Sequence, residues 1–273
     1  MNALSKTPAN FNRKSNWRVS CLDKPTASRQ IQIGMFWKNS RCEFLVLIMA
    51  LAALVAGCHS PRTAISSDAE LLAARTNYPA HWWAAVPTNG VPAWEILPQE
   101  AKPGEVILSK RNELGLLSNF APTPFTFHGQ RYASLEGFWQ MMKYPETPAD
   151  PRAKFPGLTW SYTREQVAQL TSFEANRAGK LGEANMKAMG ITWVTFEGKR
   201  MEYKPAQPGE HYKLIVAATC EKVRQNPEVQ KVLFTTGDLI LKPDHHPETN
   251  APAAWCYFEI LTQIRTELRR ESK

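Results

Sequence analysis

From residue 134 onward, apolar side chains recur every three or four positions in several stretches, and this spacing predicts helices. Ser134 is a good N-cap, Thr163 begins a capping box, and Gly190 follows the last periodic position of a helix. The predicted helices run from Ser134 to near Tyr144, from Thr163 over a short stretch, over residues 173–189 and 211–225, from Asn226 onward, and over 255–270.

Strand patterns are fewer and shorter than the helix patterns. The candidate strands are residues 105–109, 125–127, 131–133 and 191–196. His128 and Gly129 separate the second candidate from the third, as in a hairpin with a tight turn. We therefore predict an α+β fold over residues 105–273, in the form of a mainly helical single domain with a small sheet.

Residues 44–57 form an apolar stretch without charge or proline, which is short for a membrane span and typical of a signal-peptide core. Lys38 precedes it, and small residues followed by Cys58 end it, which resembles a bacterial lipobox. The resemblance implies lipidation of Cys58 and a membrane anchor in the cell envelope. The alternative is a buried helix that ends in Cys, in a cytoplasmic protein. Met35 would give a normal basic leader, so we hypothesise that translation starts there, which N-terminal sequencing tests.

The sequence before the predicted domain divides into two parts. Residues 1–57 are an N-terminal extension with the signal peptide, and residues 58–104 are a Pro-rich tether. Three tryptophans, Trp82, Trp83 and Trp94, are too apolar for a free linker. We expect part of the tether to pack on the domain.

The net charge of +8 is concentrated at the N-terminus. Residues 1–43 hold eight Lys or Arg and two Asp or Glu, so they account for +6 of the total. The remainder is nearly neutral and does not predict a nucleic-acid-binding surface. The hydrophobic content of 43%, with nine Trp and twelve Phe, indicates a packed globular core.

Cysteines and histidines do not indicate a metal site. Cys220 and Cys256 are the cysteines of the predicted domain, and they show no CxxC spacing. His245 and His246 have no third ligand at a fixed spacing. We expect no metal and no other cofactor. The two cysteines could form a disulfide in an oxidising compartment or remain separate buried thiols.

The candidate chemistry lies in the first predicted helix. Glu136, Gln140 and Lys143 follow one another at spacings of four and three, which places a carboxyl, an amide and an amine on one helix face. Large apolar residues separate them, so burial can shift their pKa values. The alternative from spacing alone is a solvated face of an ordinary amphipathic helix.

Several short motifs around this helix occur in a fixed order. They are GLLSNF at residues 115–120, YASLE at 132–136, then Gln140 and Lys143, and LFTTGD at 233–238. This ordered set resembles the NADAR family, which includes the YbiA-like N-glycosidases. The resemblance covers about residues 105–270. It implies an α+β fold and hydrolysis of N-glycosidic bonds in phosphorylated riboflavin-pathway intermediates or in ADP-ribosylated bases.

The resemblance also implies roles for individual residues. Glu136 and Lys143 match the family's catalytic glutamate and lysine, and Asn119 and Asp238 match the polar residues of its SNF and TGD motifs. Glu136 would stabilise charge at the anomeric carbon and activate water, while deprotonated Lys143 would form a Schiff base with a ring-opened ribose. The expected partner is a small ribosyl or ADP-ribosyl substrate, with nucleic acid only as a modified substrate.

Further residues are candidates for substrate binding. Arg111 and Lys110 would hold a phosphate. Gln140 would hold a ribose hydroxyl or Lys143, Asp238 would orient the sugar or Lys143, and Trp139 would stack on a base. The alternatives are that Asn119 and Asp238 are turn and cap residues, and that Trp139 belongs to the core.

Two departures from the family pattern concern substrate choice. Gly137 stands where the family has His, which suggests a close approach of another segment, and residues 253–258 replace a Gly-rich motif before the last helix. These departures motivate a second hypothesis, a catalytically inactive nucleotide- or ADP-ribose-binding lipoprotein. A third is a structural envelope lipoprotein that binds no ligand.

Overall fold

The protein has a mixed α+β fold that is mostly helical and contains small two-stranded sheets. The computed structural model describes residues 75–248 and 250–271. The predicted signal peptide, Cys58 and Met35 lie outside these residues. None of the helices in the described ranges has the length and hydropathy that crossing a bilayer requires.

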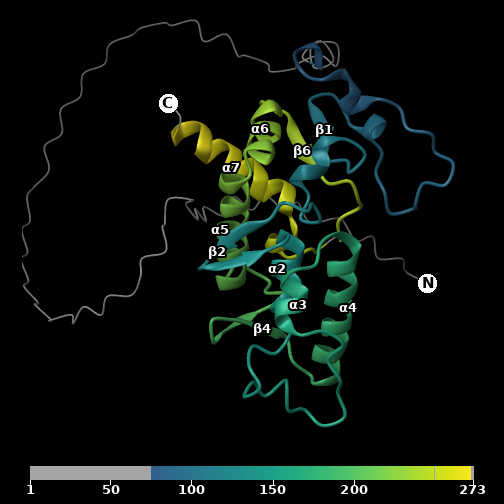
Figure 1. Ribbon diagram of the computed structural model, residues 1–273. Coiled ribbons are helices and arrows are strands. Elements are labelled where there is room, and N and C mark those ends of the chain that lie inside the picture. The colour runs from purple at the N-terminus through teal and green to yellow at the C-terminus, as the bar shows by residue number, and fades with distance from the viewer. Residues whose placement is uncertain (1–74, 249, 272–273) are drawn as a thin grey trace, which may run out of the picture.

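Six α-helices account for most of the described secondary structure. They are α2 (Leu135–Met141), α3 (Arg164–Ala168), α4 (Ser172–Ala188), α5 (Glu210–Gln225), α6 (Pro227–Thr235) and α7 (Tyr257–Glu271). Figure 1 shows α6 and α7 in the upper part of the molecule, with α2 and α3 next to each other below them. The sequence predicts all six, because each has a periodic apolar face or a recognisable cap.

The strands form three separate pairs rather than one small sheet. In the first pair β1 (Glu105–Ile107) runs parallel to β6 (Ile240–Lys242), with Val106 opposite Leu241. The others are antiparallel hairpins, β2 (Phe125–Phe127) with β3 (Gln130–Tyr132), and β4 (Trp193–Phe196) with β5 (Lys199–Glu202). The first hairpin has the predicted turn, with His128 and Gly129 at positive φ.

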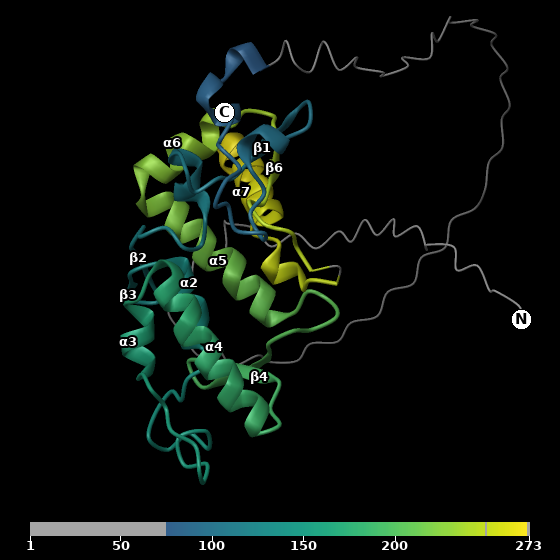
Figure 2. The ribbon, with the colours of Figure 1, turned by 90° about the vertical axis from the view of Figure 1, so that its right-hand side faces the viewer.

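An aromatic cluster joins α2 to both hairpins. Phe138 of α2 is fully buried and contacts Phe125, Phe127, Tyr132 and Phe196 at ring-centroid distances of 4.8–6.1 Å. Edge-to-face contacts of this kind add to the hydrophobic stabilisation of the buried area. The cluster fixes one face of α2, so that its opposite face is presented to α4, which lies beside it in Figure 2.

The segment before β1 packs on the domain. Short 3-10 helices occupy Arg75–Asn77, Ala80–Trp83 and Pro98–Glu100. Trp82 is 1% exposed, and its indole N–H donates to Glu113 at 2.6 Å. Trp83 donates to the carbonyl oxygen of Glu105 at 2.9 Å. Trp94, in contrast, is 45% exposed.

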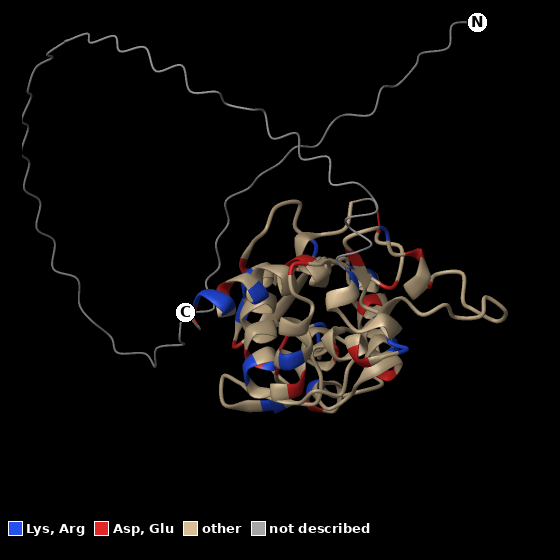
Figure 3. Ribbon diagram, turned by 90° about the horizontal axis from the view of Figure 1, so that it is seen from above, with Lys and Arg blue, Asp and Glu red and all other residues tan. Residues whose placement is uncertain are grey.

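Viewed from above in Figure 3, basic and acidic residues are interspersed over the described helices. Cys256 carries a free thiol, so it does not pair with Cys220.

Candidate functional site

A cavity of about 550 Å³ opens between α2, α4 and the loops that follow β1 and β6. Five of the predicted site residues line it: Asn119, Glu136, Trp139, Gln140 and Lys143. The tertiary structure therefore brings the SNF motif and the helix beginning at Ser134 to one cavity. Its wall also holds residues that sequence reasoning did not single out, of which Asn176 and Glu183 contact the candidate pair directly.

Glu136 lies in the first turn of α2 with only 5% of its surface exposed. Gln140 donates to its Oε1 at 2.8 Å and Asn176 of α4 donates to the same oxygen at 3.3 Å. Burial raises the pKa of Glu136, while the two amide donors and the charge of Lys143 oppose that rise. A carboxyl with a raised pKa can hold a proton near neutral pH and give it to a leaving group.

The backbone of Glu136 ties α2 to the SNF motif. Ser134 caps the helix by accepting from the Gly137 N–H at 2.9 Å, and its hydroxyl donates to the Leu170 carbonyl at 2.8 Å. The Glu136 N–H donates to the Asn119 carbonyl at 2.9 Å. The fully buried ammonium of Lys222 donates to the neighbouring Ser118 carbonyl at 2.6 Å. These contacts hold residues 118–119 and the start of α2 in place independently of any ligand.

Lys143 lies in the turn after α2 rather than on the helix. The helix ends at Met141, and the Lys143 N–H donates to the Gln140 carbonyl at 3.2 Å. The Lys143 side chain is 3% exposed, and its Nζ donates to the Gly179 carbonyl at 3.2 Å and to Glu183 Oε2 at 3.0 Å. Burial lowers the pKa of Lys143, and Glu183 partly offsets this by stabilising the ammonium. A lowered pKa increases the fraction of nucleophilic free amine.

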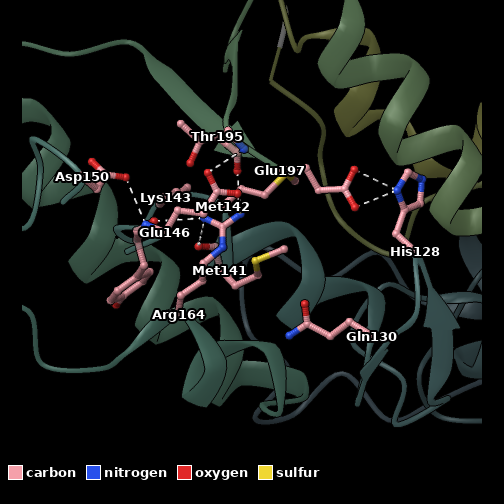
Figure 4. Close-up of polar contacts among 12 residues, drawn as sticks. His128, Gln130, Met141, Met142, Lys143, Glu146, Asp150, Arg164, Thr195 and Glu197 are labelled. Carbon is pink, nitrogen blue, oxygen red and sulfur yellow. Dashed lines mark hydrogen bonds and ion pairs between the residues drawn. The ribbon is translucent and has the colours of Figure 1, made fainter. Parts of the chain in front are cut away.

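Two arginines hold this turn in place. Arg164 donates to the carbonyls of Met141 at 3.2 Å and Tyr144 at 3.0 Å, as Figure 4 shows for Met141. Arg152 donates to the carbonyls of Met142 at 3.0 Å and Lys143 at 3.2 Å. Cations at the C-terminal end of a helix satisfy its free carbonyl groups and complement its dipole. Side chains that lie outside the cavity therefore hold the backbone of Lys143, the candidate nucleophile, in place.

Glycines allow α2 to approach its neighbours closely. A Cβ atom on Gly137 would lie 2.5 Å from the Leu170 carbonyl oxygen, and one on Gly179 would lie 2.0 Å from Gln140 Oε1. On Gly182 it would lie 3.1 Å from the Lys143 Cβ. The close approach expected from Gly137 is confirmed, and it explains why a His side chain does not fit at this position.

Asn176 and Glu183 were missed because they belong to another helix. With Gly179 they occupy positions i, i+3 and i+7 of α4, so they share the face that α2 contacts. Glu183 also accepts from Lys204 at 2.7 Å. Lys204 and Lys143 lower the pKa of Glu183, although its partial burial acts in the opposite direction. The sequence signal is the run of small buried residues on this face of α4, which marks a close helix contact.

Arg111 and Asp238 lie outside the cavity, which corrects their predicted roles. Arg111 donates to both carboxylate oxygens of Glu95, at 2.6 and 2.7 Å, and Lys110 lines the cavity in its place. The Asp238 side chain is 96% exposed and accepts from Arg269 at 2.8 Å. It follows Gly237 at positive φ, so the alternative of a turn residue applies.

The described residues contain no group of three or more His, Cys, Asp or Glu arranged to hold a metal ion. Comparison of the chain with protein-family models, with curated proteins and with solved structures gives no match.

Proposed function

We propose that the protein is a hydrolase that cleaves N-glycosidic bonds of ribose phosphate or ADP-ribosyl substrates, with a NADAR-like (YbiA-like) fold. The observation that carries this proposal is a buried carboxyl with a raised pKa and a buried amine with a lowered pKa in one 550 Å³ cavity. Groups shifted in this way are typical of acid/base and nucleophilic catalysis. The ordered motifs of the sequence support the same reaction.

In the first step the free amine of Lys143 attacks the anomeric carbon. The bond from that carbon to the base nitrogen breaks, and the base takes a proton from the Glu136 carboxyl. The bond from the anomeric carbon to the ring oxygen then breaks, and the ring oxygen takes a proton from the Lys143 nitrogen. A protonated imine then joins Lys143 to the open-chain sugar. This division of one reaction into two steps is the general benefit of covalent catalysis.

In the second step water adds to the imine carbon, and the Glu136 carboxylate accepts its proton. The carbon–nitrogen bond to Lys143 breaks, the sugar leaves as an aldehyde, and the amine is restored. The net reaction consumes one water and releases the base and the ribosyl group. Gln140 and Asn176 keep the Glu136 carboxyl in place throughout, because both donate to its Oε1.

Reductive trapping tests this assignment directly. Incubation of the full-length protein with ribose 5-phosphate and borohydride is expected to leave a stable sugar adduct on Lys143, located by peptide mass mapping. Lys143→Met is expected to lose the adduct and to reduce release of base from N-glycosides that join ADP-ribose to a free base by at least about a hundredfold, the scale on which nucleophile removal acts.

Lys187→Met is the matched control, because Lys187 is an exposed lysine of α4 that does not line the cavity. It is expected to retain both the adduct and the turnover. An adduct that persists in Lys143→Met, or unchanged turnover in that variant, contradicts the proposal.

The second candidate is a nucleotide- or ADP-ribose-binding lipoprotein without catalysis. Trp255 and Tyr257, which come from the region that departs from the family pattern, line the cavity and can alter its substrate. Calorimetric binding of ADP-ribose without any release of base from these N-glycosides would favour this candidate over the hydrolase.

A further inference from the structure

The mouth of the cavity carries exposed aromatic side chains that the proposed chemistry does not use. Trp94 is 45% exposed and Phe173 is 55% exposed, and both line the cavity together with Phe120. The Trp94 and Phe173 rings lie 6.3 Å apart between centroids, and the Phe120 and Phe173 rings lie 5.2 Å apart. We refer to Trp94, Phe120 and Phe173 as the aromatic rim.

The aromatic rim is held in position by the backbone around it. Glu95, next to Trp94, forms an ion pair with Arg111 and a β-bridge with His245. On the other side, the Ser172 N–H donates to the Phe120 carbonyl at 3.0 Å, which joins the start of α4 to the SNF motif. Ordered aromatic side chains lose little conformational entropy when a ligand binds.

A cation lies beside this aromatic surface. Lys110 Nζ is 5.9 Å from the Trp94 ring centroid and 5.3 Å from that of Phe120, and it forms an ion pair with Asp244. The cavity thus holds a buried titratable pair, Glu136 and Lys143, and a separate set of exposed aromatic rings beside a cation. A nucleotide sugar has the same division, with a ribose at one end, phosphates, and a planar base at the other.

We propose that the aromatic rim binds the planar base of a nucleoside diphosphate sugar whose terminal ribose lies against Glu136 and Lys143. Every base has a π-face that stacks on aromatic side chains, and this contact is largely independent of base identity. Trp94 belongs to the segment before β1, so this segment completes the substrate site. The placement of the ribose rests on the proposed function, whereas the placement of the base rests on the aromatic rim alone.

Calorimetry with two probes tests the rim. ADP-ribose carries both a base and a terminal ribose, and ribose 5-phosphate carries only the sugar end. Trp94→Ala and Phe173→Ala are each expected to raise the Kd of the full-length protein for ADP-ribose by about 5- to 100-fold, the loss that removal of a stacked aromatic causes. The Kd for ribose 5-phosphate is expected to stay within about twofold of the wild-type value.

Phe155→Ala is the matched control, because Phe155 is also an exposed large hydrophobic residue, at 41%, and it lies outside the cavity. It is expected to leave both affinities unchanged. Trp94→Phe, which keeps a stacking face, is expected to restore most of the ADP-ribose affinity, and thermal unfolding checks that each variant is folded.

The outcomes separate this inference from the proposed function. Unchanged ADP-ribose affinity in both alanine variants overturns the base site, and an equal loss of affinity for both probes overturns it too. Neither result contradicts the hydrolase proposal. Selective loss of ADP-ribose affinity in a protein that releases no base supports the rim and contradicts the hydrolase. Failure of the wild-type protein to bind either probe overturns both.

Discussion

Burial shifts the Glu136 carboxyl and the Lys143 amine towards their neutral forms. Each loses solvation of its charge, so the pKa of the acid rises and that of the base falls. Neither group is left without partners, because the amides of Gln140 and Asn176 contact the carboxyl and Glu183 contacts the amine. Glu183 therefore limits how far the pKa of Lys143 falls.

Replacement of Glu183 by Gln tests this balance through the pH profile. Loss of the carboxylate removes a negative charge that stabilises the Lys143 ammonium, so the pKa of Lys143 falls further. More free amine is then present at a given pH. The acidic limb of the pH dependence of kcat/KM, measured as base release, is expected to move to lower pH.

Glu210→Gln serves as the control for Glu183→Gln. Glu210 also forms ion pairs with two lysines, Lys199 and Lys213, and it lies outside the cavity. Its pKa is lowered to about 2 by these partners, so it is charged throughout the assay range. A shift of the limb to higher pH in Glu183→Gln, or the same shift in both variants, would contradict the role given to Glu183.

At the level of elements, the site depends on how closely α2 approaches α4 and the loop before it. Gly137 faces the backbone carbonyls of Leu170 and Val167, at 2.5 and 2.9 Å from an added Cβ. Backbone atoms cannot move aside as the end of a flexible side chain can. The glycine at this position is therefore a packing requirement of this chain.

Gly137→Ala is accordingly expected to destabilise the protein by about 1–3 kcal/mol or more, as overpacking of a tight contact does. The midpoint of urea denaturation checks this. Gly209→Ala is the control, because the nearest atom to its added Cβ lies at 4.0 Å, and a loss below about 1 kcal/mol is expected there. Equal losses in the two variants would contradict the close-packing argument.

The elements themselves were largely predictable, and their pairings were not. Ser134 and Thr163 cap α2 and α3 as expected, because capping depends on neighbours two or three residues away. The pairing of β1 with β6 joins Glu105 to Ile240, and no local pattern specifies such a partner. β5 and β6 were missed because both are short and each has a single buried residue, Met201 in β5 and Leu241 in β6.

At the level of the whole molecule, the cavity is assembled from segments that are distant in the chain. Trp94 precedes the domain, Asn119 lies in a loop, Glu136 in α2, Glu183 in α4, and Trp255 ahead of α7. The part of the tether that packs on the domain is thus also a part of the cavity wall. The remainder of the tether separates this folded body from Cys58.

Lipidation of Cys58 would place the cavity at a membrane surface in the bacterial cell envelope, and it remains a proposal of the sequence. Metabolic labelling with a clickable palmitate analogue is expected to modify the wild-type protein and not Cys58→Ser, with the product recovered in the membrane fraction. Cys256→Ser, which removes a free thiol of the domain, is expected to keep the label. Absence of label in the wild type would favour a cytoplasmic enzyme.

The sequence by itself determined the helices, their caps, the first hairpin and the placement of Glu136 and Gln140 on one side of α2, because these depend on contacts between near neighbours. Only the tertiary structure decided which polar residues share the cavity. It brought in Asn176 and Glu183, it kept Lys110 of the two predicted phosphate-binding residues, and it left Arg111 and Asp238 outside. The physical reason is that burial and charge pairing between distant segments arise from packing, which residue spacing does not encode.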